Sequence, residues 1–194
     1  MYIRPAFEEK DLTRIVGLIT EHNFGVLITE NPITVSHIPF TANHDGETIT
    51  LQAHLAAANP QCTALNGGTA VAVFTGPHAY ISPSWYQTQP AVPTWDYAAV
   101  YVHGTLEPII ENGPVLDALA AIDPAGFRVA KLDDDYRTMM YRGIRSFRLR
   151  GTRIEAQWKM SQNRSKEDRT RVAAALRAQG DTTVADIIDA TLDQ

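Results

Sequence analysis

Cysteine is almost absent from this 194-residue chain, in which Cys62 is the single one. One thiol cannot form an internal disulfide and has no CxxC companion, which excludes a disulfide scaffold and a cysteine-based zinc site. No apolar run approaches the roughly 18 residues of a membrane-spanning helix, and Met1 leads into the chain without the apolar core of a signal peptide. We therefore expect a cytoplasmic protein with no membrane contact and no structural metal.

The common catalytic motifs are also missing. The chain has no GxGxxG, Walker A, HExxH, GxSxG or zinc-finger spacing. His78 and Asp96 are the candidates if the protein needs a catalytic acid or base, and a structural role is favoured for both. The sequence leaves open whether the protein is an enzyme.

Composition and charge indicate an ordinary globular protein with an uneven charge distribution. Hydrophobic residues make up 44% and charged residues 20%, which excludes wholesale disorder. The segment from Arg137 to Arg177 contains twelve Lys and Arg residues and three acidic residues, which gives it a net charge of +9. Because the whole chain has a net charge of −5, the rest of the chain carries −14. The basic third can attract a cofactor phosphate, a nucleic-acid backbone or an acidic partner, or can be a solvated face.

Hydrophobic periodicity and turn residues predict helices and strands in mixed order. The predicted helices cover 8–22, 56–65, 114–122, 133–142, 166–179 and 183–192. The predicted strands cover 24–29, 33–38, 48–53, 69–75 and 97–106, followed by a hairpin of 144–149 and 153–158 about Arg150-Gly151-Thr152. Six or seven strands with short connections and peripheral helices describe an α+β protein around a small antiparallel barrel. We expect one domain over 1–194, with the C-terminal helices at about 164–194.

Four polar and aromatic clusters stand at the ends of predicted strands. They are Gly76 to Tyr86 (GPHAYISPSWY), which begins where the strand 69–75 is expected to end, His54 to Gln61 (HLAAANPQ), Val92 to Tyr97 (VPTWDY) and Lys159 to Arg164 (KMSQNR). Together they offer cations and backbone N–H groups for a phosphate, amides and hydroxyls for a ring edge, and aromatic walls. These groups suit flavin mononucleotide (FMN) or a similar planar phosphorylated ligand.

The residue sequences of these clusters, together with Met1-Tyr2-Ile3 at the start of the chain, resemble the FMN-binding negative transcriptional regulator family. This family is typified by the protease synthase and sporulation negative regulator. The resemblance implies an FMN-binding split barrel similar to pyridoxamine-phosphate oxidases, usually a homodimer with cofactor sites at the subunit interface. By the same resemblance, the expected cofactor-binding residues are His54, Asn59, Tyr80, Ser82, Trp85, Tyr86, Thr94, Trp95, Lys159, Gln162, Asn163 and Arg164.

The chain departs from the family pattern at three places. Ala57 stands where an arginine is expected, which removes a phosphate cation, and Asp96 stands where asparagine is usual, which adds a carboxylate. The segment 123–132 lacks the family's acidic and Pro-Trp features. FMN thus remains the expected cofactor, with Ala57 as the feature that weakens its phosphate site.

Several functions remain open at this stage. A regulator would use the arginines of the basic third to contact DNA, although no helix-turn-helix is evident and the molecule is acidic overall. A flavin-dependent oxidoreductase would use the same pocket for redox chemistry. A further alternative is haem binding through two of the histidines His37, His54, His78 and His103. We favour the simpler interpretation, in which each histidine makes ordinary hydrogen bonds.

Overall fold

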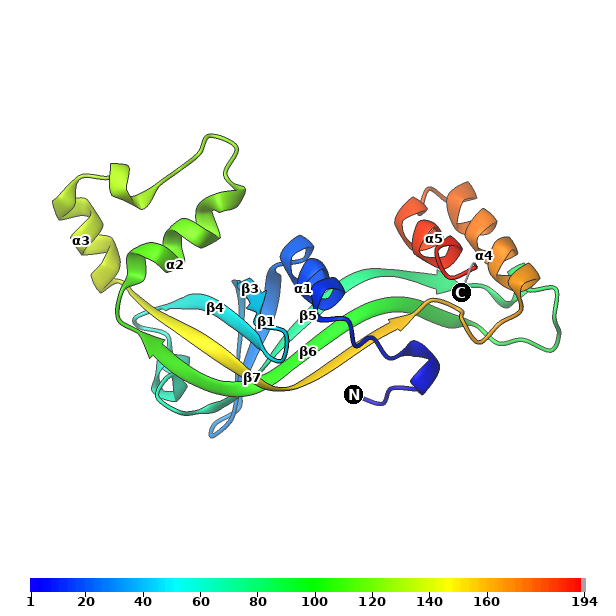
Figure 1. The fold of residues 1–194 in the computed structure, drawn as a ribbon, viewed down its shortest axis with the longest axis horizontal. Coiled ribbons are helices and arrows are strands. Elements are labelled where there is room, and N and C mark those ends of the chain that lie inside the picture. The colour runs from blue at the N-terminus through cyan, green and yellow to red at the C-terminus, as the bar shows by residue number, and fades with distance from the viewer. Residues whose placement is uncertain (193–194) are drawn as a thin grey trace. The chain divides into compact units, whose positions relative to one another are not determined.

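The computed structural model, drawn as a ribbon in Figure 1, describes residues 1–192. These residues form two compact units. The first unit contains Met1–Lys10, Thr75–Val100 and the described chain from Glu155 onward, and the second contains Asp11–Phe74 and Tyr101–Ile154. That residues 1–194 act as one domain stays a prediction.

All seven strands belong to one sheet, with the order β2-β1-β5-β6-β7-β4-β3 (Figure 1). The strands are β1 Phe24–Thr29, β2 Thr34–Pro39, β3 Thr41–His44, β4 Ile49–Ala56, β5 Thr69–Ile81, β6 Thr94–Ile109 and β7 Ile144–Lys159. The registered pairs β1 with β2, β1 with β5, β3 with β4 and β4 with β7 are antiparallel. The long strands β5, β6 and β7 contribute residues to both units. The seven-stranded alternative of the predicted α+β fold is therefore confirmed.

The core of the second unit is built in part by β4, in which buried apolar residues alternate with half-buried ones. In β4 every second residue, from Ile49 to Leu55, is buried. Three buried rings meet at the centre, where Phe40 lies edge-on to Phe74 with centroids 5.3 Å apart and to Phe147 with centroids 6.5 Å apart. Edge-to-face rings at these separations favour a well-ordered core.

The helices of the second unit are α1 Leu12–Glu21, α2 Asn112–Leu119 and α3 Asp134–Arg142. Helix α1 starts four residues later than predicted, because Asp11 caps it by accepting from the backbone N–H of Thr13 at 2.9 Å. The predicted helix 56–65 is wrong: β4 extends to Ala56, and only the 3₁₀ turn η2 (Pro60–Ala64) follows. Asn59 does cap that turn, as its position before a proline predicted.

In the first unit, α4 (Lys166–Ala178) and α5 (Thr182–Asp189) pack against each other (Figure 1). Val172 and Leu176 of α4 and Ile188 of α5 are buried. Ser165 caps α4 by accepting from the N–H of Asp168 at 3.1 Å. Two short 3₁₀ turns, η1 (Pro5–Phe7) and η3 (Pro83–Trp85), complete this unit. None of the helices within residues 1–192 is long and apolar enough to cross a membrane.

Two predicted chain breaks are absent. The GPHAYISPSWY segment does not follow the end of a strand, since β5 continues through it to Ile81. The predicted hairpin at 144–158 is one continuous strand, β7. Gly151 there marks close packing rather than a turn, because a Cβ on it would lie 2.7 Å from the carbonyl oxygen of Ile49.

Candidate functional site

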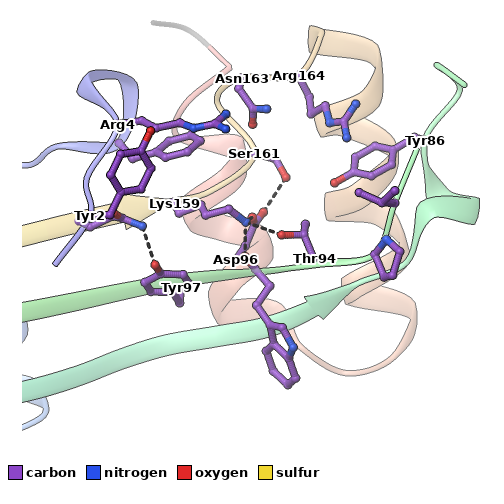
Figure 2. Close-up of a pocket in the computed structure, with 15 residues that line it drawn as sticks. Tyr2, Arg4, Tyr86, Thr94, Asp96, Tyr97, Lys159, Ser161, Asn163 and Arg164 are labelled. Atoms are coloured by element: carbon purple, nitrogen blue, oxygen red, sulfur yellow. Dashed lines mark hydrogen bonds and ion pairs between the residues drawn. The ribbon is translucent and has the colours of Figure 1, made fainter. Parts of the chain in front are cut away.

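The first unit contains a cavity of about 470 Å³, within the usual range of small-molecule sites (Figure 2). Its lining comes from the N-terminal segment, from the chain that enters β6 and from the end of β7 with the loop after it. The lining residues are Tyr2, Arg4, Phe7, Tyr86, Val92, Pro93, Thr94, Trp95, Asp96, Tyr97, Gln157, Lys159, Ser161, Asn163 and Arg164.

Asp96, Gln157, Lys159 and Ser161 form the polar floor of the cavity. Asp96 is fully buried. Its Oδ2 accepts a hydrogen bond from Ser161 Oγ at 2.6 Å, and its Oδ1 lies 3.3 Å from the ammonium of Lys159. Burial raises the pKa of Asp96, and the Ser161 hydrogen bond and the Lys159 charge only partly offset that effect. The carboxylate is therefore a costly charge that depends on these two partners.

The ammonium of Lys159 is fully engaged within the protein. It donates to Thr94 Oγ1 at 2.8 Å, to the carbonyl oxygen of Trp95 and to Asp96 Oδ1 at 3.3 Å (Figure 2). A lysine has three N–H donors, so these three acceptors occupy all of them. Lys159 and Asp96 thus form an internal ion pair that joins β7 to the start of β6.

Gln157 lies beside this pair and is 3% exposed. Its Nε2 donates to the hydroxyl of Tyr97 at 2.7 Å, whereas its Oε1 is buried without a hydrogen-bond partner among residues 1–192. A buried polar atom without a partner is rare in native proteins and suggests a missing donor. A ligand with an N–H or O–H group can supply that donor.

The walls of the cavity are aromatic. Arg164 places its guanidinium 4.3 Å from the centroid of the buried Tyr86 ring. Trp95 is 54% exposed, and its ring centroid lies 6.2 Å from that of His78 and 6.1 Å from that of Tyr80. Ring faces and guanidinium groups at a cavity mouth suit a planar ligand with a negative charge.

Helix α4 fixes the chain just after GPHAYISPSWY. Asp168, 1% exposed, accepts from the backbone N–H groups of Gln87 at 2.6 Å and of Thr88 at 3.2 Å. Burial alone would raise the pKa of Asp168, but the hydrogen bonds from residues 87 and 88 outweigh it and lower that pKa. Arg171 Nε also donates to the carbonyl oxygen of Trp85 at 3.0 Å. These contacts hold Tyr86 in the cavity wall.

The N-terminal segment is held against the end of β7. Phe7 is buried, the N–H of Glu9 donates to the carbonyl oxygen of Ala156 at 3.0 Å, and Glu8 forms an isolated bridge with Gln157. This attachment brings Tyr2 and Arg4 to the cavity (Figure 2).

The structure brings together half of the residues expected to bind a cofactor. Those that line the cavity are Tyr86, Thr94, Trp95, Lys159, Asn163 and Arg164. Four others lie in the same unit but do not line it: Tyr80, Ser82, Trp85 and Gln162. Ser82 caps η3, and Gln162 is bound to the backbone of Trp158 and Met160, with both distances 2.6 Å.

His54 and Asn59 belong to the second unit. Asn59 Nδ2 donates to Ser36 Oγ at 3.1 Å in addition to capping η2. Burial lowers the pKa of His54, whose Nδ1 is buried without a partner among residues 1–192. A cofactor role for both remains a prediction.

Sequence reasoning missed several lining residues: Tyr2, Arg4, Phe7, Tyr97, Gln157 and Ser161. Tyr97 and Ser161 stand inside the quoted clusters VPTWDY and KMSQNR, so the clusters located them without assigning a role. No local pattern identifies Arg4 or Gln157, because each reaches the cavity only through the pairing of the N-terminal segment with β7.

Comparison with solved structures shows the fold. The FAD and haem binding protein from Mycobacterium smegmatis matches with a TM-score of 0.61 at 17% identity, over 78% of this chain and 73% of that one. The flavocytochrome Anf3 from Azotobacter vinelandii matches with a TM-score of 0.59 at 10% identity, over 81% of this chain and 72% of that one. These matches confirm the predicted split-barrel architecture.

Sequence comparison shows the family. The chain is 31% identical over 181 residues to the protease synthase and sporulation protein PAI 2 of Bacillus subtilis (strain 168), covering 87% of this chain and 85% of that protein. A family model described as "Putative FMN-binding domain" matches residues 1–153, which end before Gln157 and Lys159 of the cavity. The predicted resemblance is confirmed: this chain belongs to the FMN-binding domain family that the model describes.

Proposed function

We propose that this protein binds FMN in the cavity of the first unit. The observation that supports this most directly is the combination, in one cavity, of aromatic walls, guanidinium groups and a buried acceptor without a donor. An isoalloxazine ring needs flat apolar contacts and partners for its polar edge, and the phosphate needs cations. The residues present fit each of these needs.

The roles follow from chemistry. Tyr86 and Trp95 offer ring faces to the flavin, and Gln157 Oε1 accepts a hydrogen bond from an N–H of the ring edge. Phe7 closes one wall and excludes water. When bound, FMN supplies one- and two-electron transfer, while the protein contributes binding, orientation and electrostatics.

We also propose that the protein is a homodimer, as the resemblance implies, and that a second copy contributes to the site. The dimer is supported by an apolar sheet face in the second unit. In that face Ile28 lies opposite both Val35 and Val71 in the β2-β1-β5 register, and Val35 is 53% exposed. Phe24, 66% exposed, extends the face. A contiguous exposed apolar face is typical of a protein–protein interface. Sedimentation of Val35→Lys should show a shift toward monomer that Thr20→Lys, on an exposed helix position, does not cause.

A regulatory role is supported only by the name of the Bacillus relative. Direct DNA binding requires free cations, yet much of the basic third is paired within the molecule. Arg148 and Arg150 lie 3.8 and 3.2 Å from Glu107, and Arg177 contacts Asp186 and Asp189. A salt-dependent DNA-binding assay separates the regulator from the oxidoreductase, for which NAD(P)H oxidation with added FMN is the readout.

The visible spectrum of the purified protein tests the cofactor proposal. We expect a flavin absorption band, or quenching of flavin fluorescence when FMN is added to colourless protein. A Soret band would instead favour the haem alternative and bring His54, His78 and His103 forward. A colourless protein that takes up neither flavin nor haem would refute the proposal.

A further inference from the structure

The floor of the cavity has no cation left for an anionic ligand. Lys159 uses its three donors on Thr94, Trp95 and Asp96, and its side chain is 21% exposed. The positive charge of Lys159 is balanced by the carboxylate of Asp96, which is fully buried 3.3 Å away. A phosphate that approached this ammonium would have to displace one of its acceptors and would lie close to a second negative charge. The floor therefore offers an anionic ligand no net positive charge.

The rim of the cavity carries two other cations, Arg4 and Arg164. Figure 2 shows Arg4 coming from the N-terminal segment and Arg164 from the loop before α4, with Asn163 beside it. Neither guanidinium forms an ion pair with a carboxylate within residues 1–192. The positive charge of Arg164 helps to lower the pKa of Asp168, but the two side chains are not hydrogen-bonded to each other. Asp168 instead accepts hydrogen bonds from the backbone N–H groups of Gln87 and Thr88.

The contact between Arg164 and Tyr86 prepares the arginine for binding. A guanidinium stacked on a ring keeps its N–H groups at the edge of the stack, where they can donate to an oxyanion. Gln157, which also lines the cavity, presents a buried acceptor, Oε1, and not a donor. The cavity thus has an anion-accepting rim and a floor that accepts a hydrogen bond.

We propose that Arg4 and Arg164 bind the ligand's anionic group at the rim, and that Lys159 acts only as a positioning residue that neutralises Asp96. This inference rests on the proposed function, in which the ligand is FMN. It assigns a ligand class: a planar ring with a donor edge that meets Gln157 and one anionic group on an arm that reaches the rim. Asp96 neutralises Lys159 in the floor, so the anionic group binds at the rim.

The test compares FMN with riboflavin, which lacks the phosphate. Dissociation constants are measured by flavin fluorescence for the full chain, Arg4→Gln, Arg164→Gln, the control Lys166→Gln and the double variant Asp96→Asn/Lys159→Gln. The control removes one exposed positive charge near the site without touching the cavity. The double variant removes both members of the buried pair, so that no lone charge unfolds the protein.

We expect the preference for FMN over riboflavin to fall about tenfold in Arg164→Gln and about three- to tenfold in the more exposed Arg4→Gln. It should change less than about twofold in the control and in the double variant. Loss of the preference in the double variant, with no loss in the arginine variants, would overturn the inference.

Inorganic phosphate separates the failure of this inference from that of the proposed function. Phosphate should raise the melting temperature of the wild-type chain and do so less in Arg4→Gln and Arg164→Gln. If flavins fail to bind but this arginine-dependent shift is present, the FMN proposal is wrong and the anion subsite stands. If phosphate protects all variants equally, or none, the anion subsite is wrong.

Discussion

The substitution Lys159→Met removes the cation from a buried ion pair and keeps most of the side-chain volume. Asp96 is then left fully buried, with hydrogen bonds from Ser161 alone, of which the one from Oγ is 2.6 Å long. Breaking a buried pair in this way costs about 3–5 kcal/mol. Because the Lys159 side chain is 21% exposed and water reaches part of the pair, we expect about 2–4 kcal/mol of destabilisation at pH 7.

The penalty should depend on pH in a defined direction. Burial raises the pKa of Asp96 above its ordinary value of 3.8, so the folded state holds this proton more tightly than the unfolded state does. Without Lys159 the pKa rises further. The Asp96-dependent part of the destabilisation should therefore be complete above the raised pKa and shrink as pH falls through it toward 3.8.

Urea unfolding at several pH values measures these free energies in wild type, Lys159→Met and the double variant Asp96→Asn/Lys159→Met. The double variant should recover most of the loss at neutral pH, because no buried charge remains. If Lys159→Met is no less stable than the double variant at pH 7, Asp96 is not a buried anion held by Lys159. Lys159 would then not stabilise a charged Asp96 in the cavity floor.

Three further predictions concern stability and use the same unfolding assay. Gly104→Ala should destabilise the fold by about 1–3 kcal/mol or more, because the new Cβ would lie 2.0 Å from the carbonyl oxygen of Arg150. Gly17→Ala in α1 should instead stabilise it by about 0.5–1 kcal/mol, because the space around Gly17 is open. Equal effects of the two substitutions would contradict this difference in packing. Phe40→Ala should cost about 3–5 kcal/mol, and a loss below 1 kcal/mol would show that the three-ring core is not tightly packed. Asp168→Asn should cost about 1–3 kcal/mol at pH 7 and progressively less as pH falls through the lowered pKa of Asp168, below 3.8; a loss that does not depend on pH would rule out a charged hydrogen-bond acceptor.

Local patterns predicted most elements of the fold. The boundaries of β1 and the start of α4 agree with the predicted ranges, because alternation and capping act within a few residues. The predictions failed at Gly151 and at GPHAYISPSWY, where glycine and proline suggested turns. Packing against Ile49 explains Gly151, and the pairing of long strands that carries β5 to Ile81 lies outside any local window.

The sequence predicted those site residues that are clustered along the chain. It did not predict those that the fold brings to the cavity from distant segments. The segments VPTWDY and KMSQNR supplied Thr94, Trp95 and Lys159, and all three line the cavity. Arg4 and Gln157 were missed because their roles depend on the attachment of the N-terminal segment to β7. The role of Lys159 was not predictable from the sequence, because it depends on three acceptors that the fold places around its ammonium.

Equilibrium titration of Gln157→Leu with FMN tests most directly whether the cavity of the first unit binds FMN. This substitution removes the buried acceptor Oε1 together with the hydrogen bond from Nε2 to Tyr97, and leaves the aromatic walls and both rim arginines in place. We predict that the wild-type chain binds FMN stoichiometrically at one site per chain and that Gln157→Leu weakens binding about tenfold. Wild-type protein that binds no FMN, or FMN binding that Gln157→Leu leaves unchanged, would contradict the claim.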